Sequence, residues 1–164
     1  MTKDADTSPL DEAHATFIQH RVTINVAARD AGHITALTRA VGCRVSTNRR
    51  KVTVFLAADS CQILLDNLSA NGAIAMVACR PSTHASIQIK GNDAVIGPLE
   101  ESDRALMAAQ LESLVTDMRK VGFFERFART VIPALSDNIV AATFTPLAVF
   151  HQTPGPGAGR RLSG

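Results

Sequence analysis

The sequence predicts a mainly β protein in which antiparallel strands form a barrel and a few helices pack around it. Residues 84–91 alternate between polar and apolar side chains, which is the period of a half-buried strand. The first three expected strands follow one another without intervening helices, which disfavours a parallel α/β sheet. The chain has 164 residues, of which 46% are hydrophobic, enough for one domain with a packed core.

The first half of the chain is expected to contain one helix and three strands. A short helix is predicted over residues 11–19, after a mobile tail at residues 1–10. In residues 21–27, β-branched residues alternate with polar ones, and the following Asp30 and Gly32 suit a hairpin turn. The strands predicted for this half span residues 21–27, 33–40 and 51–57, with a polar turn at 46–50.

The second half is expected to alternate strands with helices. A short helix opens at Asp59 or Ser60, whose side chains can cap free backbone N–H groups, and Gly72 suits its end. Residues 100–120 form the strongest predicted helix, because acidic residues crowd its start and basic residues its end. Pro146 indicates an edge or a bulge in the last strand. The strands are expected at 73–79, 84–91, 94–96 and 138–150, with a second amphipathic segment at 123–131.

The chain is interpreted as a single domain spanning residues 1–152. Residues 153–164 are rich in proline and glycine and are expected to form a mobile tail. The polar, acidic N-terminus lacks the features of a secretory signal, and no apolar run reaches the ~20 residues of a membrane-spanning helix. We therefore expect a cytoplasmic protein with no membrane partner.

Composition argues against two further classes. The formal net charge is +2 and the chain has neither Trp nor Tyr, so it lacks the dense basic stripe and stacked aromatic rings of nucleic-acid-binding surfaces. The three cysteines and five histidines show neither the spacing of a disulfide framework nor that of a metal site. Neither a nucleic-acid partner nor a bound metal is expected.

Two groups of residues are candidates for ligand contact. The first is the basic series Arg39, Arg44, Arg49, Arg50 and Lys51. Arginine presents a planar fork that suits two phosphate oxygens, and Arg39 and Arg44 lie at the end of an apolar strand. A solvated barrel rim is the alternative interpretation for these two residues. For the run 49–51, a solvated charged turn is favoured.

The second group is the polar face of the strand at 84–91. Its members are His84, Ser86, Gln88 and Lys90. A strand face with four polar groups must meet solvent, another subunit or a ligand. Ligand or subunit contact and plain solvent exposure are both compatible with this pattern.

Three segments resemble the pyridoxamine 5'-phosphate oxidase-like proteins. Residues 80–91, RPSTHASIQIKG, resemble the mid-barrel strand of that family, in which a short turn and Thr-His precede an alternating strand that closes on Gly. Residues 64–71 are similar to the family's short helix ending in Asn. Residues 148–156 look like one branch of the family. The resemblance covers most of residues 17–156. It consists of the order of elements and of short sequence matches, and it includes no catalytic signature.

The resemblance implies a six-stranded antiparallel split β-barrel, a homodimer, and FMN bound near the dimer interface. Arg39 or Arg44 would match the family's phosphate-binding arginine, and Ser60 its serine. The family's lysine falls near Gln62, which carries no charge. The residues expected at the flavin edge or facing the other subunit are Thr83, His84 and Gln88. The implied activity is a redox reaction on a small-molecule substrate, with no catalytic residue identified.

Two alternatives remain open at this stage. The glutamine at position 62 favours a cofactor-free dimeric binding module on the same barrel. The same fold could also use another cofactor, such as a deazaflavin or haem, because one fold hosts many functions.

Overall fold

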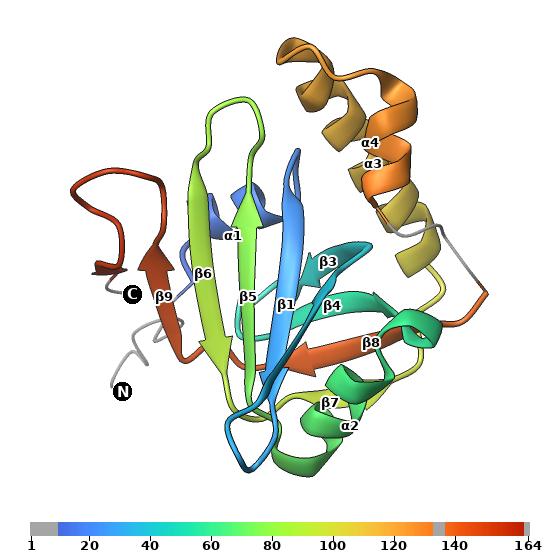
Figure 1. Cartoon of the computed structure of the whole chain (residues 1–164), viewed down its shortest axis with the longest axis vertical. Helices are drawn as coiled ribbons and strands as arrows, with labels where there is room; N and C mark the ends of the chain where they lie inside the picture. Colours follow the sequence, from blue (N-terminus) through green and yellow to red (C-terminus); the bar gives the residue numbers. More distant parts are fainter. Residues whose placement is uncertain (1–9, 133–136, 163–164) are drawn as a thin grey trace, which may run out of the picture.

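The structure, a computed structural model, describes residues 10–132 and 137–162. Within them, ten strands form two antiparallel sheets (Figure 1). The six-stranded sheet has the order β10 (Arg161–Leu162), β9 (Ala148–His151), β6 (Ser86–Gly91), β5 (Ile74–Cys79), β1 (Thr23–Arg29), β2 (Thr35–Arg39). The four-stranded sheet has the order β3 (Gly42–Val45), β4 (Val52–Ala57), β8 (Ile139–Phe144), β7 (Val95–Gly97). The helices are α1 (Glu12–Ile18), the 3-10 helix η1 (Ala58–Ser60), α2 (Gln62–Asn71), α3 (Asp103–Lys120) and α4 (Glu125–Val131).

The predicted mainly antiparallel β class, with helices around the sheets, is confirmed. The expected six-stranded split barrel is not seen as such: the strands form two sheets of six and four strands, and no strand pairing in the described ranges joins them into one barrel. Most expected helices and strands are present within a few residues of their predicted bounds.

Two stretches differ from the sequence-based expectation. Strand β3 was not predicted, because its four residues are too short to show an alternating pattern; it pairs with β4, with Gly42 opposite Phe55. The strand expected over 138–150 is two strands in different sheets, β8 and β9. Pro146 lies in the break, where its missing backbone N–H cannot extend a strand ladder.

The chain crosses from one sheet to the other at two consecutive residues. The Ala40 N–H donates to the Ile24 carbonyl of β1, at 2.9 Å. The Val41 N–H donates to the Phe55 carbonyl of β4, also at 2.9 Å. This corner places the two sheets face to face.

The main core fills the space between the sheets. Along β1, buried Ile24, Val26 and Ala28 alternate with half-buried residues, so one face of the strand points into the core. The other sheet contributes Leu56 and Phe144. Helices α1 and α2 supply further core residues: Ala15, Ile18, Leu64, Leu65 and Leu68.

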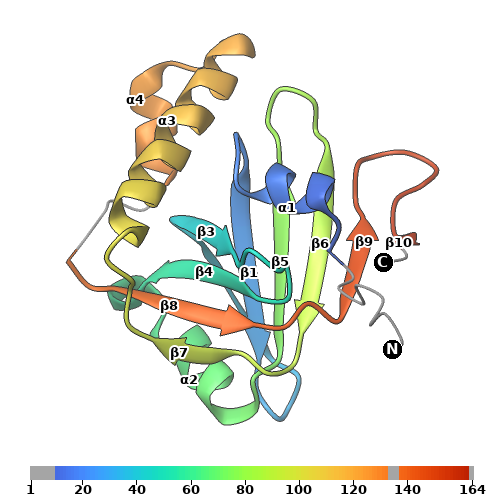
Figure 2. The ribbon, with the colours of Figure 1, turned by 180° about the vertical axis from the view of Figure 1, so that it is seen from behind.

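A second, smaller core lies on the other side of the four-stranded sheet. Helices α3 and α4 pack there (Figure 2), with Met107, Leu114 and Met118 of α3 against Phe55 of β4. Strand β4 is therefore buried on both faces along its whole length. This double burial explains why residues 51–57 read as a nearly continuous apolar run.

The predicted tails have two outcomes. Residues 1–9 lie outside the described residues, whereas Leu10 is fully buried in the main core. The C-terminal segment is described as far as Leu162, and it folds back so that β10 pairs with β9. No helix in the described part of the chain is both long and apolar enough to cross a membrane.

The close approach of Gly91 to Phe144 gives a test of the packing between the sheets. A Cβ atom at Gly91 would lie 2.5 Å from Phe144 Cδ2 and 2.9 Å from the Thr145 carbonyl oxygen. Gly91→Ala should therefore destabilise the fold by about 1–3 kcal/mol, or roughly 2–12 °C in melting temperature. Gly97→Ala on β7 is the control, because no atom lies within 4 Å of its Cβ position. Equal melting temperatures for the two variants would contradict this packing.

Candidate functional site

The face of the six-stranded sheet that points away from the main core is the candidate site, and we call it the open face. It faces the viewer in Figure 1, and no described helix covers its centre at β5 and β1. Its residues on β1 and β5 are half-buried, because they alternate with core residues on the other side of each strand. Such a surface suits a ligand or a second protein chain.

Strand pairing brings two of the predicted site residues onto one row of the open face. Arg39 is opposite Asn25, Asn25 is opposite Val77, and Val77 is opposite Gln88. Directly opposed residues of antiparallel strands share a face. The row therefore crosses four strands, a span of about 14 Å at the usual strand spacing.

Arg39 is the free cation of this row. Its side chain is half-buried at the end of β2, and no hydrogen bond or ion pair joins its guanidinium to any other residue within 10–132 and 137–162. A partly desolvated charge without a partner is unfavourable. An anionic ligand group would satisfy it through charge-assisted hydrogen bonds.

The far end of the row is polar and more crowded. The Gln152 side-chain N–H donates to Gln88 Oε1 at 3.4 Å, and the Gln152 backbone N–H donates to the Ser86 carbonyl at 2.8 Å. Ser86 is buried, while the Lys90 ammonium group lies 5.1 Å from the centre of the Phe150 ring. The four polar residues predicted to share one face thus differ widely in exposure.

A cavity of about 290 Å³ lies on the open face beside this row. Small residues of β1 and β5, such as Ala27 and Ala75, form its floor, and Arg29, Thr35 and Lys90 also line it. Its volume is near the lower end of the range for small-molecule pockets, about 300 Å³. The open face therefore combines a shallow apolar depression with nearby cations.

Arg44 lies on the other sheet and has two carboxylate partners. Its Nε donates to Asp103 Oδ1 at 2.9 Å, and its Nη2 lies 2.9 Å from Glu100 Oε1. Asp103 is fully buried at the start of α3, and its second oxygen accepts the Glu100 backbone N–H at 2.8 Å. The geometry makes Arg44 part of the attachment of α3 to β3 and leaves Arg39 as the arginine available to a ligand.

Ser60 and Gln62 are exposed where the chain enters α2. The Ser60 hydroxyl donates to the Ala57 carbonyl at 3.0 Å. The Gln62 amide donates to Asp66 one turn later in the helix, at 2.8 Å. Helix α2 packs against β1 and β2, the strands that carry Asn25 and Arg39. Within residues 10–132 and 137–162, no hydrogen bond joins Ser60 or Gln62 to Arg39 or Arg44, so the four candidate phosphate residues are not linked to one another.

Thr83 and His84 lie in the turn between β5 and β6, and both are exposed. His84 has φ of 58°, in the left-handed region. This turn is held by Asp117 of α3, which is almost fully buried and accepts hydrogen bonds from the Ser82 hydroxyl at 2.7 Å and the Ser82 N–H at 2.9 Å. Helix α3 thereby fixes the position of Thr83 and His84 relative to the end of the sheet.

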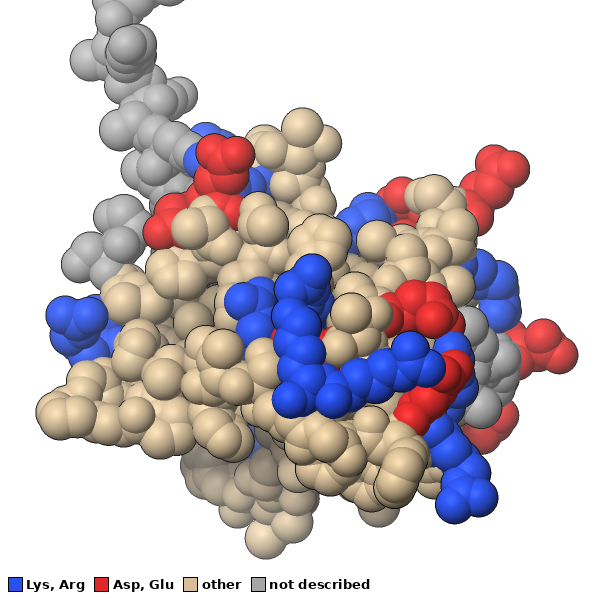
Figure 3. Space-filling view, turned by 90° about the horizontal axis from the view of Figure 1, so that it is seen from above, with Lys and Arg blue, Asp and Glu red and all other residues tan. Residues whose placement is uncertain are grey.

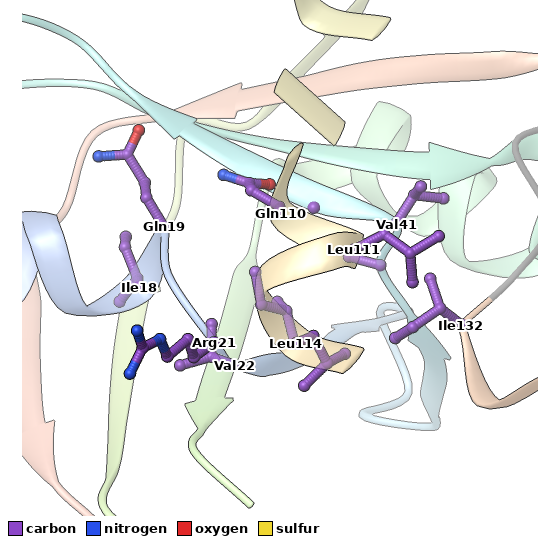
Figure 4. Close-up of a pocket in the computed structure, with 12 residues that line it drawn as sticks. Ile18, Gln19, Arg21, Val22, Val41, Gln110, Leu111, Leu114 and Ile132 are labelled. Atoms are coloured by element: carbon purple, nitrogen blue, oxygen red, sulfur yellow. The ribbon is translucent and has the colours of Figure 1, made fainter. Parts of the chain in front are cut away.

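A second cavity, between the start of β1 and α3, is too small for a cofactor. Figure 4 shows Leu111 and Leu114 of α3 facing Val22 and Val41 across it. Its volume is about 10 Å³, close to that needed for one water molecule. This cavity is a packing gap under α3.

The three cysteines are free thiols. Cys43 and Cys61 are buried free thiols that donate to the carbonyls of Ile18 and Ala57. Burial raises the pKa of both thiols, so neither is an activated nucleophile. The described residues contain no cluster of three or more His, Cys, Asp or Glu that could hold a metal ion.

Sequence analysis missed three residues that lie beside the candidate residues or hold them in place. Asn25 lies beside Arg39, and its polar side chain within an apolar alternating strand was the available signal. Asp103 and Asp117 are buried carboxylates on α3. Each was one acidic residue among several on an amphipathic helix, so no local pattern distinguished it.

Comparison with known proteins identifies the fold. No protein-family model and no curated protein sequence matches the chain. Among solved structures, an F420 reductase is 14% identical, with a TM-score of 0.53, over 85% of this chain and 97% of that one. HupZ from Group A Streptococcus is 13% identical, with a TM-score of 0.53, over 91% and 98%. A candidate pyridoxamine 5'-phosphate oxidase from Lactobacillus delbrueckii is 11% identical, with a TM-score of 0.52, over 90% and 96%.

Identities this low establish the arrangement of the chain and nothing finer. The three proteins are matched along nearly their full lengths, so the similarity covers the whole domain and extends beyond a single sheet. The chain has the fold of the pyridoxamine 5'-phosphate oxidase-like proteins, as the resemblance in its sequence predicted.

Proposed function

We propose that this chain is a cytoplasmic FMN-binding protein of the oxidoreductase type, which works as a homodimer on a split barrel and acts on a small molecule. The observation that carries the proposal is the half-buried Arg39, which has no partner in the described part of the chain and lies beside Asn25 on the open face. The phosphate of FMN carries close to two negative charges near neutral pH and would satisfy this cation.

The row from Arg39 to Gln88 fits the remainder of the cofactor. With the phosphate at Arg39, a ring system could extend over Asn25 and Val77 towards the amide of Gln88. Small residues such as Ala27 and Ala75 leave room above the sheet. FMN would supply the electron or hydride transfer, and the chain would supply binding and orientation.

The homodimer is supported by exposed apolar residues next to the open face. Ile34 directly precedes the edge strand β2 and Leu37 lies on it, and each side chain is 70% exposed. Ile63 is 72% exposed on α2, which packs against β2. A second copy of the chain would cover these side chains and would complete the wall of the cofactor site. Exposed apolar groups of this kind are typical of protein interfaces.

A cofactor-free dimeric binding module is the second candidate, and one observation favours it. Both side chains at the entry to α2, Ser60 and Gln62, are bonded within their own segment, so neither is directed to an incoming phosphate. The similarity to an F420 reductase keeps a deazaflavin as a third possibility on the same face. Haem is a further alternative, and an absorbance spectrum of the purified protein distinguishes all of these.

The first prediction concerns FMN affinity. Wild-type protein should be yellow or should bind added FMN, and Arg39→Ala should weaken binding by about 1.5–3 kcal/mol, roughly 10- to 150-fold in Kd. Arg50→Ala is the control, because this exposed arginine lies in the β3–β4 turn. Titration followed by flavin fluorescence gives both constants. A colourless protein whose melting temperature is unchanged by FMN would contradict the flavoprotein hypothesis and favour the cofactor-free binding module.

The second prediction separates the two arginines. Arg44→Ala leaves the buried Asp103 carboxylate without its guanidinium and should cost about 3 kcal/mol, or roughly 6–12 °C in melting temperature. Arg39→Ala removes no internal partner and should leave the melting temperature nearly unchanged. Differential scanning calorimetry without FMN measures both. A larger loss for Arg39→Ala than for Arg44→Ala would reverse this assignment of roles.

The third prediction concerns the oligomer. Wild-type protein should be a dimer in size exclusion with light scattering, and Leu37→Asp should weaken the dimer by about 2 kcal/mol, roughly 30-fold. Val95→Asp on β7 is the matched control, since Val95 is 68% exposed on the other sheet. A monomeric wild type, or equal effects of the two substitutions, would rule out an interface at β2.

A further inference from the structure

The hairpin of α3 and α4 ends in a group of exposed apolar side chains at residues 121–127, which we call the aromatic tip. Val121, Phe123, Phe124 and Phe127 lie within seven residues, and their exposed fractions are 44%, 44%, 82% and 48%. The rings of Phe123 and Phe127 stack with centroids 4.9 Å apart, so the apolar surface is already formed. Large exposed apolar groups gathered in this way usually mark an interaction site.

These rings are not a displaced part of the core. The α4 segment has its own anchors in the second core, because Ala128 within the helix and Ile132 directly after it are both buried there with residues of α3. Phe124 and Phe127 remain exposed although these neighbours are buried. Gly122, with φ of 85°, ends α3 in the left-handed region that favours glycine and turns the chain into the tip.

The tip is surrounded by basic side chains. Arg119, Lys120, Arg126 and Arg129 lie in the same segment, against one acidic residue, Glu125. Glu125 is shared by Arg119 and Arg129, and Arg129 also pairs with Glu112 at 2.8 Å. Lys120 and Arg126 have no side-chain partner among the residues that the structure describes. The segment thus presents unneutralised positive charge next to exposed rings.

The tip projects at one end of the molecule. In Figure 1 the α3–α4 hairpin reaches the same end as the β5–β6 turn, away from α2. Figure 3 views this end, where Lys and Arg side chains gather across the middle with Asp and Glu side chains beside them. A projecting apolar tip beside cations matches a bilayer surface, where rings enter the interfacial region and cations meet lipid phosphates.

We propose that the α3–α4 tip is a peripheral docking site for an anionic lipid bilayer, with Phe124 and Phe127 entering the interface and Lys120 and Arg126 contacting the headgroups. The sequence analysis expected no membrane partner because it searched for a spanning segment. Peripheral contact needs only a few suitable residues on one surface. Docking would leave the open face clear of the membrane, since the open face lies along the side of the sheet.

The absence of Trp and Tyr from the chain allows a direct test. Phe124→Trp gives the chain its only tryptophan, and the emission of this residue should shift to the blue with phosphatidylcholine–phosphatidylglycerol vesicles but not with phosphatidylcholine alone. Val95→Trp is the matched control, because Val95 is 68% exposed on β7, which lies at the other end of the molecule (Figure 1). Its emission should not change. Added salt should weaken the shift, since it screens exposed charges.

Two further variants separate the apolar and the electrostatic contributions to vesicle binding, which is measured by co-sedimentation of the full chain. Phe124→Ser should reduce binding by at least about tenfold, through loss of buried apolar surface. Lys120→Gln with Arg126→Gln should remove the preference for phosphatidylglycerol. Binding that persists in Phe124→Ser, or a wild type that stays in the supernatant with both vesicle types, would overturn the proposal. A blue shift of Phe124→Trp with protein concentration alone would also overturn it and would assign the tip to contact between copies.

Discussion

The structure depends on a single main core shared by two sheets. Each strand alternates its side chains, so the sheets can share that core only if one face of each points inward. The inward face of the six-stranded sheet carries residues such as Val26, Met76 and Ile89, all fully buried. Its outward face must then be left to other partners. The corner at Ala40–Val41, where consecutive N–H groups bond to different sheets, fixes this arrangement.

The proposed site follows from that constraint. Arg39 is the last residue of β2 before the corner, so its backbone is held by the ladder with β1 while its side chain remains on the open face. Arg44, five residues later, lies beyond the corner and meets the buried Asp103. Two arginines that look equivalent in the sequence therefore have different environments, one internally neutralised and one available to an anion.

Helix α3 links the second core to both proposed surfaces, the open face and the aromatic tip. Its start pairs with Arg44, its buried Asp117 holds the turn that carries Thr83 and His84, and its end leads to the aromatic tip. The turn and the tip are thus fixed to one rigid helix that packs on β4. A helix that lies outside both sheets therefore determines where the exposed loops at one end are presented.

Local patterns in the sequence were enough to predict the class of fold and most of its strands, because the alternation at 84–91 and the apolar run at 51–57 are visible without the structure. The sequence also pointed to Arg39 and Gln88, which the strand register places on one row. Only the tertiary structure separated Arg39 from Arg44, divided residues 138–150 between two sheets and revealed the buried partners Asp103 and Asp117. The charge of Arg44 is neutralised by Asp103, which lies 59 positions away in the sequence. No local pattern of spacing carries that information.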